Sequence, residues 1–192
     1  MAEDCARPAD ACVAVLRTLI AARRRRAARW RIAAAATVAA LPCLLTAAWR
    51  PSAAFVWNAS ASAPKGLYRL FEGEAPRRGD WVVAWLPKDM RGLAASRGYL
   101  PLRVPLVKRV AAVRGDRVCA KGSEVRVNGR LAAVRRAIDA RGRPLPDWQG
   151  CVLLSGGDAF LLGTHPWSFD GRYFGITGRA DITGRAVLLW RA

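Results

Sequence analysis

One lysine of this chain stands in a setting that changes its chemistry. The 192-residue sequence has four lysines against twenty-eight arginines, and Lys108 is the lysine inside an otherwise apolar segment, residues 104–113. Burial disfavours a charged ammonium and lowers its pKa, so the neutral amine can take a proton near neutral pH. Lys108 is therefore a candidate general base. The alternative is a strand-edge lysine that keeps its amine in water.

A lysine base needs a hydroxyl to activate, and Ser62 is the conspicuous one. It lies in the small-residue segment 58–68, NASASAPKGLY. Alone, such a serine is an ordinary loop residue, and the Gly-x-Ser-x-Gly elbow is absent. The only histidine is His165, so a serine nucleophile has either that residue or a lysine as its base. We interpret His165 as a surface or loop residue.

The residues from Ser62 to Lys65 also spell Ser-x-x-Lys, the pattern of β-lactamases and penicillin-binding proteins. That motif lies on a helix, and Pro64 with Gly66 opposes one. A Lys-Thr-Gly sequence does not follow, and the chain is too short for the companion helical domain. The pattern therefore does not favour that class.

A membrane anchor is predicted ahead of these residues. Residues 32–49 carry no charge and would span roughly 27 Å as a helix, enough for a bilayer core. Residues 1–31 hold eight arginines against three acidic residues, which predicts a cytoplasmic N-terminus and an exported segment 50–192. A cleavable signal peptide is the alternative, but its basic region would be unusually long.

The exported segment is predicted to be mostly β. Strand-like runs of branched and aromatic residues recur, and Asn128-Gly129 is a strong hairpin signal between two of them. Residues 135–150, rich in Gly and Pro, predict an irregular loop. The expected strands cover residues 80–86, 104–113, 124–127, 130–134, 152–154, 159–162 and 186–190.

Two cysteines, Cys119 and Cys151, fall in this exported segment, where an oxidising compartment permits a disulfide. The alternative is a pair of buried thiols. Their spacing is unlike a zinc site, and one histidine cannot build a multi-histidine metal centre. We expect no metal and no cofactor.

Four separated blocks of the chain resemble the S26 signal peptidase family and, within it, the conjugative-transfer TraF-type branch. The resemblance covers roughly residues 50–190. The Pro-x-Gly-Leu-Tyr sequence at residues 64–68 is typical of the TraF type. The blocks are residues 60–68 (SASAPKGLY), 79–83 (GDWVV), 107–116 with its Val-Lys-Arg and Gly-Asp ends, and 168–175 (SFDGRYFG) followed by 184–186 (GRA).

The resemblance implies a role for individual residues. It makes Ser62 the nucleophile and Lys108 the general base. Ser60 matches the serine whose hydroxyl helps to form the oxyanion hole, together with the backbone N–H of Ser62. Ser168 matches the serine that orients the lysine amine.

Asp170 and Arg172 match a supporting pair that is more structural than catalytic. The chain departs from general signal peptidases at Ala63, where they usually carry Met, and at Pro64, which follows the nucleophile by two positions. Gly171 replaces a commoner Ser. The first two departures favour the TraF-type branch.

The sequence thus predicts an S26 signal-peptidase-like, β-rich catalytic domain after one transmembrane helix in a bacterial inner membrane, with that domain in the periplasm. The resemblance implies a serine endopeptidase that processes an exported pilin precursor for conjugative transfer or type IV secretion, with cyclisation possible. One alternative is a general type I signal peptidase acting on other leader-bearing proteins. Another is a noncatalytic basic membrane scaffold of a secretion channel.

The strong positive charge, +18, first suggests nucleic acid as a partner. Its distribution argues otherwise. Residues 1–31 carry a net charge of +5, which we interpret as a topology signal. The remaining 161 residues carry a net charge of +13 without a dense run of basic residues. That spread fits a soluble face near anionic lipid, and we expect no nucleic-acid partner.

Overall fold

The computed structural model describes residues 17, 23–26, 29–42 and 54–192. The chain divides into two units, Met1–Ser52 and Ala53–Ala192. In the first, residues 23–26 and 29–42 are helical. The helix includes residues 32–42 of the predicted span, whereas residues 43–49 lie outside the described residues. None of the helices described is both long enough and apolar enough to cross a membrane.

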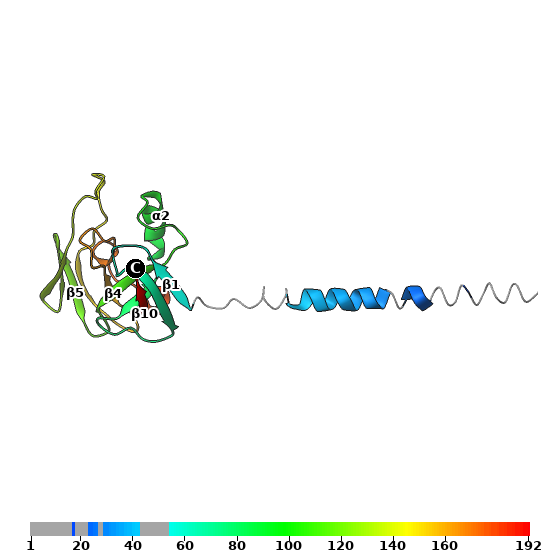
Figure 1. The fold of residues 1–192 in the computed structure, drawn as a ribbon. Coiled ribbons are helices and arrows are strands. Elements are labelled where there is room, and N and C mark those ends of the chain that lie inside the picture. The colour runs from blue at the N-terminus through cyan, green and yellow to red at the C-terminus, as the bar shows by residue number, and fades with distance from the viewer. Residues whose placement is uncertain (1–16, 18–22, 27–28, 43–53) are drawn as a thin grey trace, which may run out of the picture. The chain divides into compact units, whose positions relative to one another are not determined.

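The second unit is built on a large antiparallel sheet (Figure 1). Its strand order is β1-β2-β10-β3-β4-β9, so β1 and β9 are the edge strands. β1 and β2 pair as a hairpin, whereas β10 returns from the end of the chain to lie between β2 and β3. The strands are β1 (Phe55–Asn58), β2 (Gly66–Glu72), β3 (Trp81–Ala84), β4 (Leu106–Ala112), β9 (Phe160–Leu162) and β10 (Ile182–Arg191).

A second antiparallel sheet has the order β7-β6-β5-β8. In Figure 1, β5 of this sheet and β1 of the large sheet lie on opposite sides of the unit. The two sheets share a core in which Phe160 of β9 packs with Val118 of β5 and Val125 of β6. The strands are β5 (Arg117–Lys121), β6 (Glu124–Val127), β7 (Arg130–Val134) and β8 (Gly150–Leu153).

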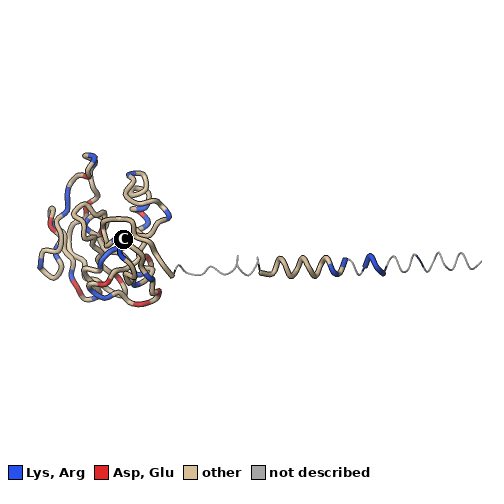
Figure 2. Tube along the Cα trace, in the orientation of Figure 1, with Lys and Arg blue, Asp and Glu red and all other residues tan. Residues whose placement is uncertain are grey.

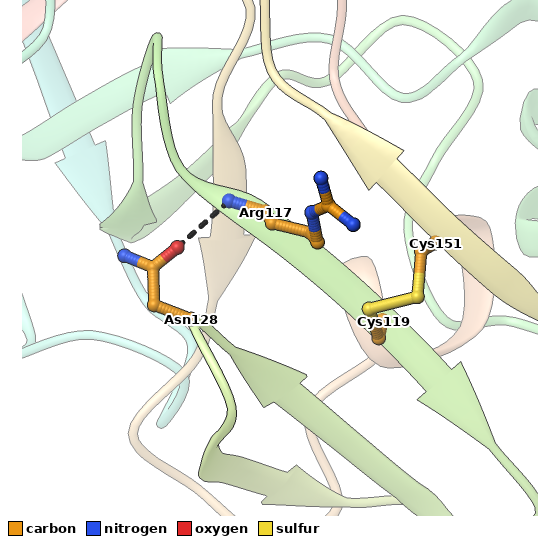
Figure 3. Close-up of a disulfide and its surroundings, with 4 residues drawn as sticks. All are labelled: Arg117, Cys119, Asn128 and Cys151. Carbon is orange, nitrogen blue, oxygen red and sulfur yellow. Dashed lines mark hydrogen bonds between the residues drawn. A yellow bond between two sulfur atoms is a disulfide. The ribbon is translucent and has the colours of Figure 1, made fainter.

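The predicted pairing of Cys119 and Cys151 is confirmed. The two residues lie directly opposite each other on β5 and β8, and a disulfide joins their sulfur atoms (Figure 3). At the start of β5, Asn128 Oδ1 accepts a hydrogen bond from the Arg117 backbone N–H at 2.8 Å. The turn of the β6–β7 hairpin is thereby joined to the disulfide-bonded strand.

The β-rich prediction is confirmed, and the predicted β6–β7 hairpin has the bounds that the sequence indicated. Asn128 takes a positive φ of 49°, which is the conformation that an Asn-Gly hairpin turn requires. Three strands were not predicted: β1, β2 and β5. Charged residues interrupt the apolar pattern of β2 and β5, and β1 is only four residues long. All three are completed by pairing with neighbouring strands.

Three short helices were also not predicted: α2 (Lys88–Ser96), α3 (Gly171–Phe174) and η1 (Arg179–Asp181). Helix α2 contains Gly92, which weakens the local helical preference. It is held by tertiary packing, because Ala94 is fully buried against Val82 and Leu106 of the large sheet. Asp170 caps the N-terminus of α3, and its side chain accepts a hydrogen bond from the Arg172 N–H.

The charge of this unit is dispersed, as expected. Figure 2 shows Lys and Arg on several separate strands and loops of the β-rich unit. Many have acidic partners, such as Arg91 with Asp181 at 2.8 Å and Arg185 with Glu74 at 2.7 Å. Exposed pairs of this kind contribute little to stability but reduce the local excess of charge.

Candidate active site

Lys108 lies in the middle of β4, on the face that packs into the core. Side chains alternate along a strand, so Lys108 shares its face with Leu106 and Val110 and lies directly opposite Val82 of β3. All four side chains are buried, and Lys108 is only 4% exposed. The apolar pattern of the segment therefore does bury the lysine, and its amine does not reach water at a strand edge.

This burial lowers the pKa of the Lys108 amine from 10.5 to about 8. The largest cause is the loss of water around the ammonium. The negative charge of Asp170 opposes the change, and the positive charge of Arg172 adds to it. A substantial fraction of Lys108 is thus neutral near physiological pH and able to accept a proton.

The Lys108 amine has one side-chain partner in the described structure. Its Nζ donates to Ser168 Oγ at 2.5 Å, although the two residues are 60 positions apart. Ser168 is 5% exposed and lies in the segment between β9 and α3. The serine thereby fixes the direction in which the amine points.

A buried ion pair holds this segment in place. The Asp170 carboxylate, which is fully buried, accepts from Arg172 Nη2 at 2.7 Å and from the Gly163 N–H at 2.7 Å. The Arg172 guanidinium in turn donates to the backbone carbonyls of Gly163, His165 and Pro166. The pair satisfies the backbone of a turn that has no strand partner.

Ser62 lies in the seven-residue loop that joins β1 to β2, residues 59–65. It is half-buried, and its Oγ is 2.7 Å from Ser60 Oγ. Its carbonyl accepts from the Thr164 N–H at 2.9 Å, which ties this loop to the segment that carries Ser168. The Ser62 N–H donates no hydrogen bond within the described part of the chain, so it is available to an incoming oxygen.

Gly163 allows the two loops to approach. A Cβ atom at this position would lie 2.0 Å from Ser168 Oγ and 3.1 Å from Ser62 Cβ. The first distance would force Ser168 to move and the second is a tight contact, so glycine is the residue that fits without a shift. Ser62, the predicted nucleophile, and Ser168, which contacts Lys108, therefore both lie beside the backbone of Gly163.

One cleft brings the predicted catalytic residues together. It has a volume of about 530 Å³, and Ser60, Ser62, Lys108 and Ser168 all line it. Asp170 and Arg172 are buried and are not among its lining residues, and the exposed His165 contributes to its wall. The remaining lining is mostly apolar and comes from residues 56–59, 61, 86, 99–101, 104–107, 167 and 169. Among the hydrogen bonds of the described residues, none joins Lys108 Nζ to Ser62 Oγ.

Three residues that shape the site were not predicted: Asn58, Gly163 and Thr164. Asn58 ends β1 and hydrogen bonds to the loop that follows it, and asparagine commonly does this in turns, so its position before a small-residue loop was a usable signal. Thr164 and Gly163 carry no such signal, because their contacts join segments about one hundred positions apart.

The chain is similar to known proteins over most of its length. Residues 27–191 match the family model described as signal peptidase, peptidase S26. Two plasmid transfer proteins TraF of Escherichia coli are each 34% identical to the chain. One alignment covers 83% of this chain and 97% of the relative, and the other covers 70% and 76%.

Among solved structures, a signal peptidase I from Enterococcus faecalis V583 matches 58% of this chain and 97% of its own chain. The sequence identity is 19% and the TM-score is 0.34. A structural similarity this low supports no inference about the site, whereas the two sequence relatives align with most of the chain.

Proposed function

The chain belongs to the signal peptidase S26 family, and on that basis we propose that it is a serine endopeptidase in which Ser62 and Lys108 form a catalytic dyad. The observation that carries the proposal is the setting of Lys108. A buried amine with a pKa of about 8 donates to Ser168 and lines the cleft that also holds Ser62. A base of this kind makes a histidine unnecessary.

The reaction follows from these groups. The neutral Lys108 amine takes the hydroxyl proton of Ser62 as Ser62 Oγ bonds to a peptide carbonyl carbon. The carbonyl oxygen becomes an anion, which the Ser62 N–H and the Ser60 hydroxyl stabilise. The carbon–nitrogen bond then breaks, and the Lys108 ammonium gives its proton to the leaving amine. Water attacks the resulting ester with Lys108 again as the base, and this restores Ser62.

The other polar residues position the dyad. Ser168 orients the Lys108 amine toward the cleft. Asp170 and Arg172 hold the turn that carries Ser168 and do not touch the reacting atoms. Their charges also act on the Lys108 pKa in opposite directions, so together they leave burial as its main determinant.

For the substrate, we infer a pilin precursor or another leader-bearing exported protein. The relatives are plasmid transfer proteins, which supports a precursor used in conjugative transfer. The cleft is largely apolar and is bounded by the edge strand β1, features suited to an extended peptide with small apolar side chains. If an amine of the substrate captured the ester in place of water, the product would be cyclic.

We further propose that residues 32–49 anchor the chain in the bacterial inner membrane, with residues 1–31 in the cytoplasm and residues 50–192 in the periplasm. The uncharged run and the arginines that precede it support this topology. The disulfide between Cys119 and Cys151 supports an oxidising compartment for the β-rich unit.

A general type I signal peptidase is the second candidate, because the matching family model describes signal peptidases as a class. The two candidates differ in how many substrates depend on the chain. Deletion of its gene should leave one pilin precursor unprocessed in the first case and many exported precursors unprocessed in the second.

The catalytic proposal itself is tested with purified full-length chain and the candidate precursor. Wild type should shorten the precursor, and Ser62→Ala and Lys108→Ala should not. Mass spectrometry then distinguishes the outcomes, because a cyclic product lacks one water relative to the linear one. Processing by both variants would overturn the dyad, whereas a wild type that leaves the precursor intact would favour a noncatalytic scaffold.

A further inference from the structure

Asn58, the last residue of β1, places its side chain inside the loop that carries Ser60 and Ser62. We propose that Asn58 is a positioning residue that sets the direction of the hydroxyl proton of Ser60 and, through it, that of Ser62. The inference rests on the proposed function, because it concerns how that serine pair reacts. It begins from a carboxamide that is 6% exposed and hydrogen bonded on both of its ends.

The orientation of this carboxamide is fixed by its surroundings. Asn58 Nδ2 faces three backbone carbonyls, those of Ser60 at 3.0 Å and of Ala63 and Pro64 at 3.1 Å. Asn58 Oδ1 faces the Ser60 N–H at 3.2 Å and the Ser60 hydroxyl at 2.9 Å. The reverse orientation would set an oxygen against three carbonyl oxygens. Oδ1 is therefore the acceptor beside Ser60.

This arrangement decides the direction of the next hydrogen bond. An amide oxygen cannot donate, so the single proton of the Ser60 hydroxyl points to Asn58 Oδ1. Ser60 Oγ can then only accept from Ser62, across the 2.7 Å between the two Oγ atoms. In the resting protein the hydroxyl protons run from Ser62 to Ser60 and from Ser60 to Asn58.

The direction of this relay matters when the reaction begins. The Ser62 proton must leave Ser60 and move to Lys108 Nζ as Ser62 Oγ bonds to the substrate carbon. The Ser60 hydroxyl, which keeps its own proton, then exchanges its acceptor, from the neutral Asn58 Oδ1 to the substrate oxygen. That exchange becomes favourable only when the oxygen is anionic, because a charged acceptor forms the stronger hydrogen bond.

Asn58 therefore makes the Ser60 contribution selective for the transition state. Before attack, the Ser60 hydroxyl is occupied by Asn58 and adds nothing to substrate binding. After attack, it stabilises the developing charge. A contact made only in the transition state raises kcat and leaves KM largely unchanged.

The test is a double-mutant cycle in the full-length chain, with a precursor whose cleavage depends on Ser62. Asn58→Leu should lower kcat about tenfold to a hundredfold, up to the loss expected for an oxyanion-hole donor. KM should stay the same or fall, because the freed Ser60 hydroxyl can also bind the substrate carbonyl before attack. In a Ser60→Ala background the same substitution should change kcat by less than about threefold, because residues that act as a unit are not additive.

Tyr68→Phe is the matched control. It removes the Tyr68 hydroxyl donor to Pro64 O, at 2.7 Å, from the same loop but leaves the Ser60 hydroxyl untouched. It should lower the melting temperature and preserve kcat. If Asn58→Leu does not fold, Asn58→Ala replaces it, because it removes the acceptor beside Ser60 without placing an oxygen against the three carbonyls. It should lower kcat, again only when Ser60 is present.

Losses in kcat that multiply in the double variant would overturn the inference and leave Asn58 a purely structural role. An unchanged kcat in Asn58→Leu would also overturn it. Both results leave the proposed function standing, provided that wild type cleaves and Ser62→Ala does not. A wild type that matches Ser62→Ala would remove the proposed function and this inference together.

Discussion

Lys108 Nζ and Ser168 Oγ meet at 2.5 Å across the boundary between a strand and a loop that are 60 residues apart in sequence. The strand supplies burial, which lowers the lysine pKa, and the loop supplies direction. Neither β4 nor the loop provides both the burial and the orientation of the amine. The chemistry of the site therefore depends on how β4 and the segment after β9 are brought together, and the predictions below test that dependence.

Replacing either member of the dyad should abolish cleavage without unfolding the protein. Ser62→Ala removes the nucleophile, and Lys108→Met removes the base while keeping an unbranched side chain in the core. We expect a loss in kcat of at least about a thousandfold for each, and no further loss in the double variant, because the two residues act as a unit. Rates from single-turnover assays, with circular dichroism spectra as the control, check this.

The activity should rise with pH. Lys108 must be neutral to accept a proton, and its pKa is about 8, so kcat/KM should increase as pH rises through that value and then level off. A pH–rate profile measured between pH 6 and 10 checks this. A midpoint near 10.5, the ordinary lysine value, would mean that Lys108 is not buried in solution.

The same lysine should make stability depend on pH. Its folded pKa of about 8 lies below the ordinary 10.5, so the unfolded chain binds more protons between these two values. The unfolding free energy should therefore rise across this window, by about 3 kcal/mol for the full difference in pKa. Urea unfolding of wild type and Lys108→Met at a series of pH values isolates the effect, because the variant should lack this rise.

Gly163→Ala should inactivate the site. The new Cβ atom would displace Ser168 and press on Ser62, so we expect a loss in kcat of about a hundredfold or more, as misplaced catalytic groups commonly cause. Gly92→Ala is the matched control, since a Cβ there meets nothing within 4 Å and lies on α2. It should keep full activity and gain about 0.5–1 kcal/mol of stability.

Asp170 and Arg172 should shift the pH profile in opposite directions. Asp170→Asn removes the charge that raises the Lys108 pKa, so the midpoint of kcat/KM should move to lower pH. Arg172→Met removes the charge that lowers it, so the midpoint should move to higher pH. Equal shifts in one direction would contradict the assignment.

Each of these two variants also leaves its partner as a lone buried charge, so each should lose about 3–5 kcal/mol of unfolding free energy. The double variant should lose less than the sum of the two single losses. Thermal unfolding of the three variants beside wild type measures this coupling.

The disulfide should affect stability and leave the chemistry intact. It closes a loop of 32 residues, for which the chain-entropy relation gives about 4 kcal/mol. It lies on β5 and β8, and neither cysteine lines the catalytic cleft. Cys119→Ser with Cys151→Ser should therefore unfold at a lower denaturant concentration but keep the wild-type kcat while folded.

The sequence predicted those parts of the fold whose cause is local. The β6–β7 hairpin follows from alternation around Asn128-Gly129, and the burial of Lys108 follows from the apolar residues beside it. Strand β2 was not predicted, because its charged residues interrupt the pattern and its burial comes from β1 and β10. Helix α2 likewise depends on packing of Ala94 and not on its own propensity.

The candidate site divides in the same way. Ser62, Lys108 and Ser168 were identified from short motifs through family resemblance, and the structure brings them to one cleft. The contact between Thr164 and Ser62 could not be predicted, because it joins backbone atoms 102 positions apart and any residue type can make it. Backbone contacts are not specified by residue type, whereas side-chain chemistry can be inferred from the sequence.

The burial of Lys108 also has a consequence for the chain before it folds. In the unfolded chain this residue is an ordinary lysine with a pKa of 10.5, and at neutral pH its amine is protonated and unable to act as a base. The low pKa of the proposed base therefore requires β3, β4 and β9 to have closed around Lys108. Under the proposed mechanism, a newly made chain stays inactive until this part of the sheet has formed.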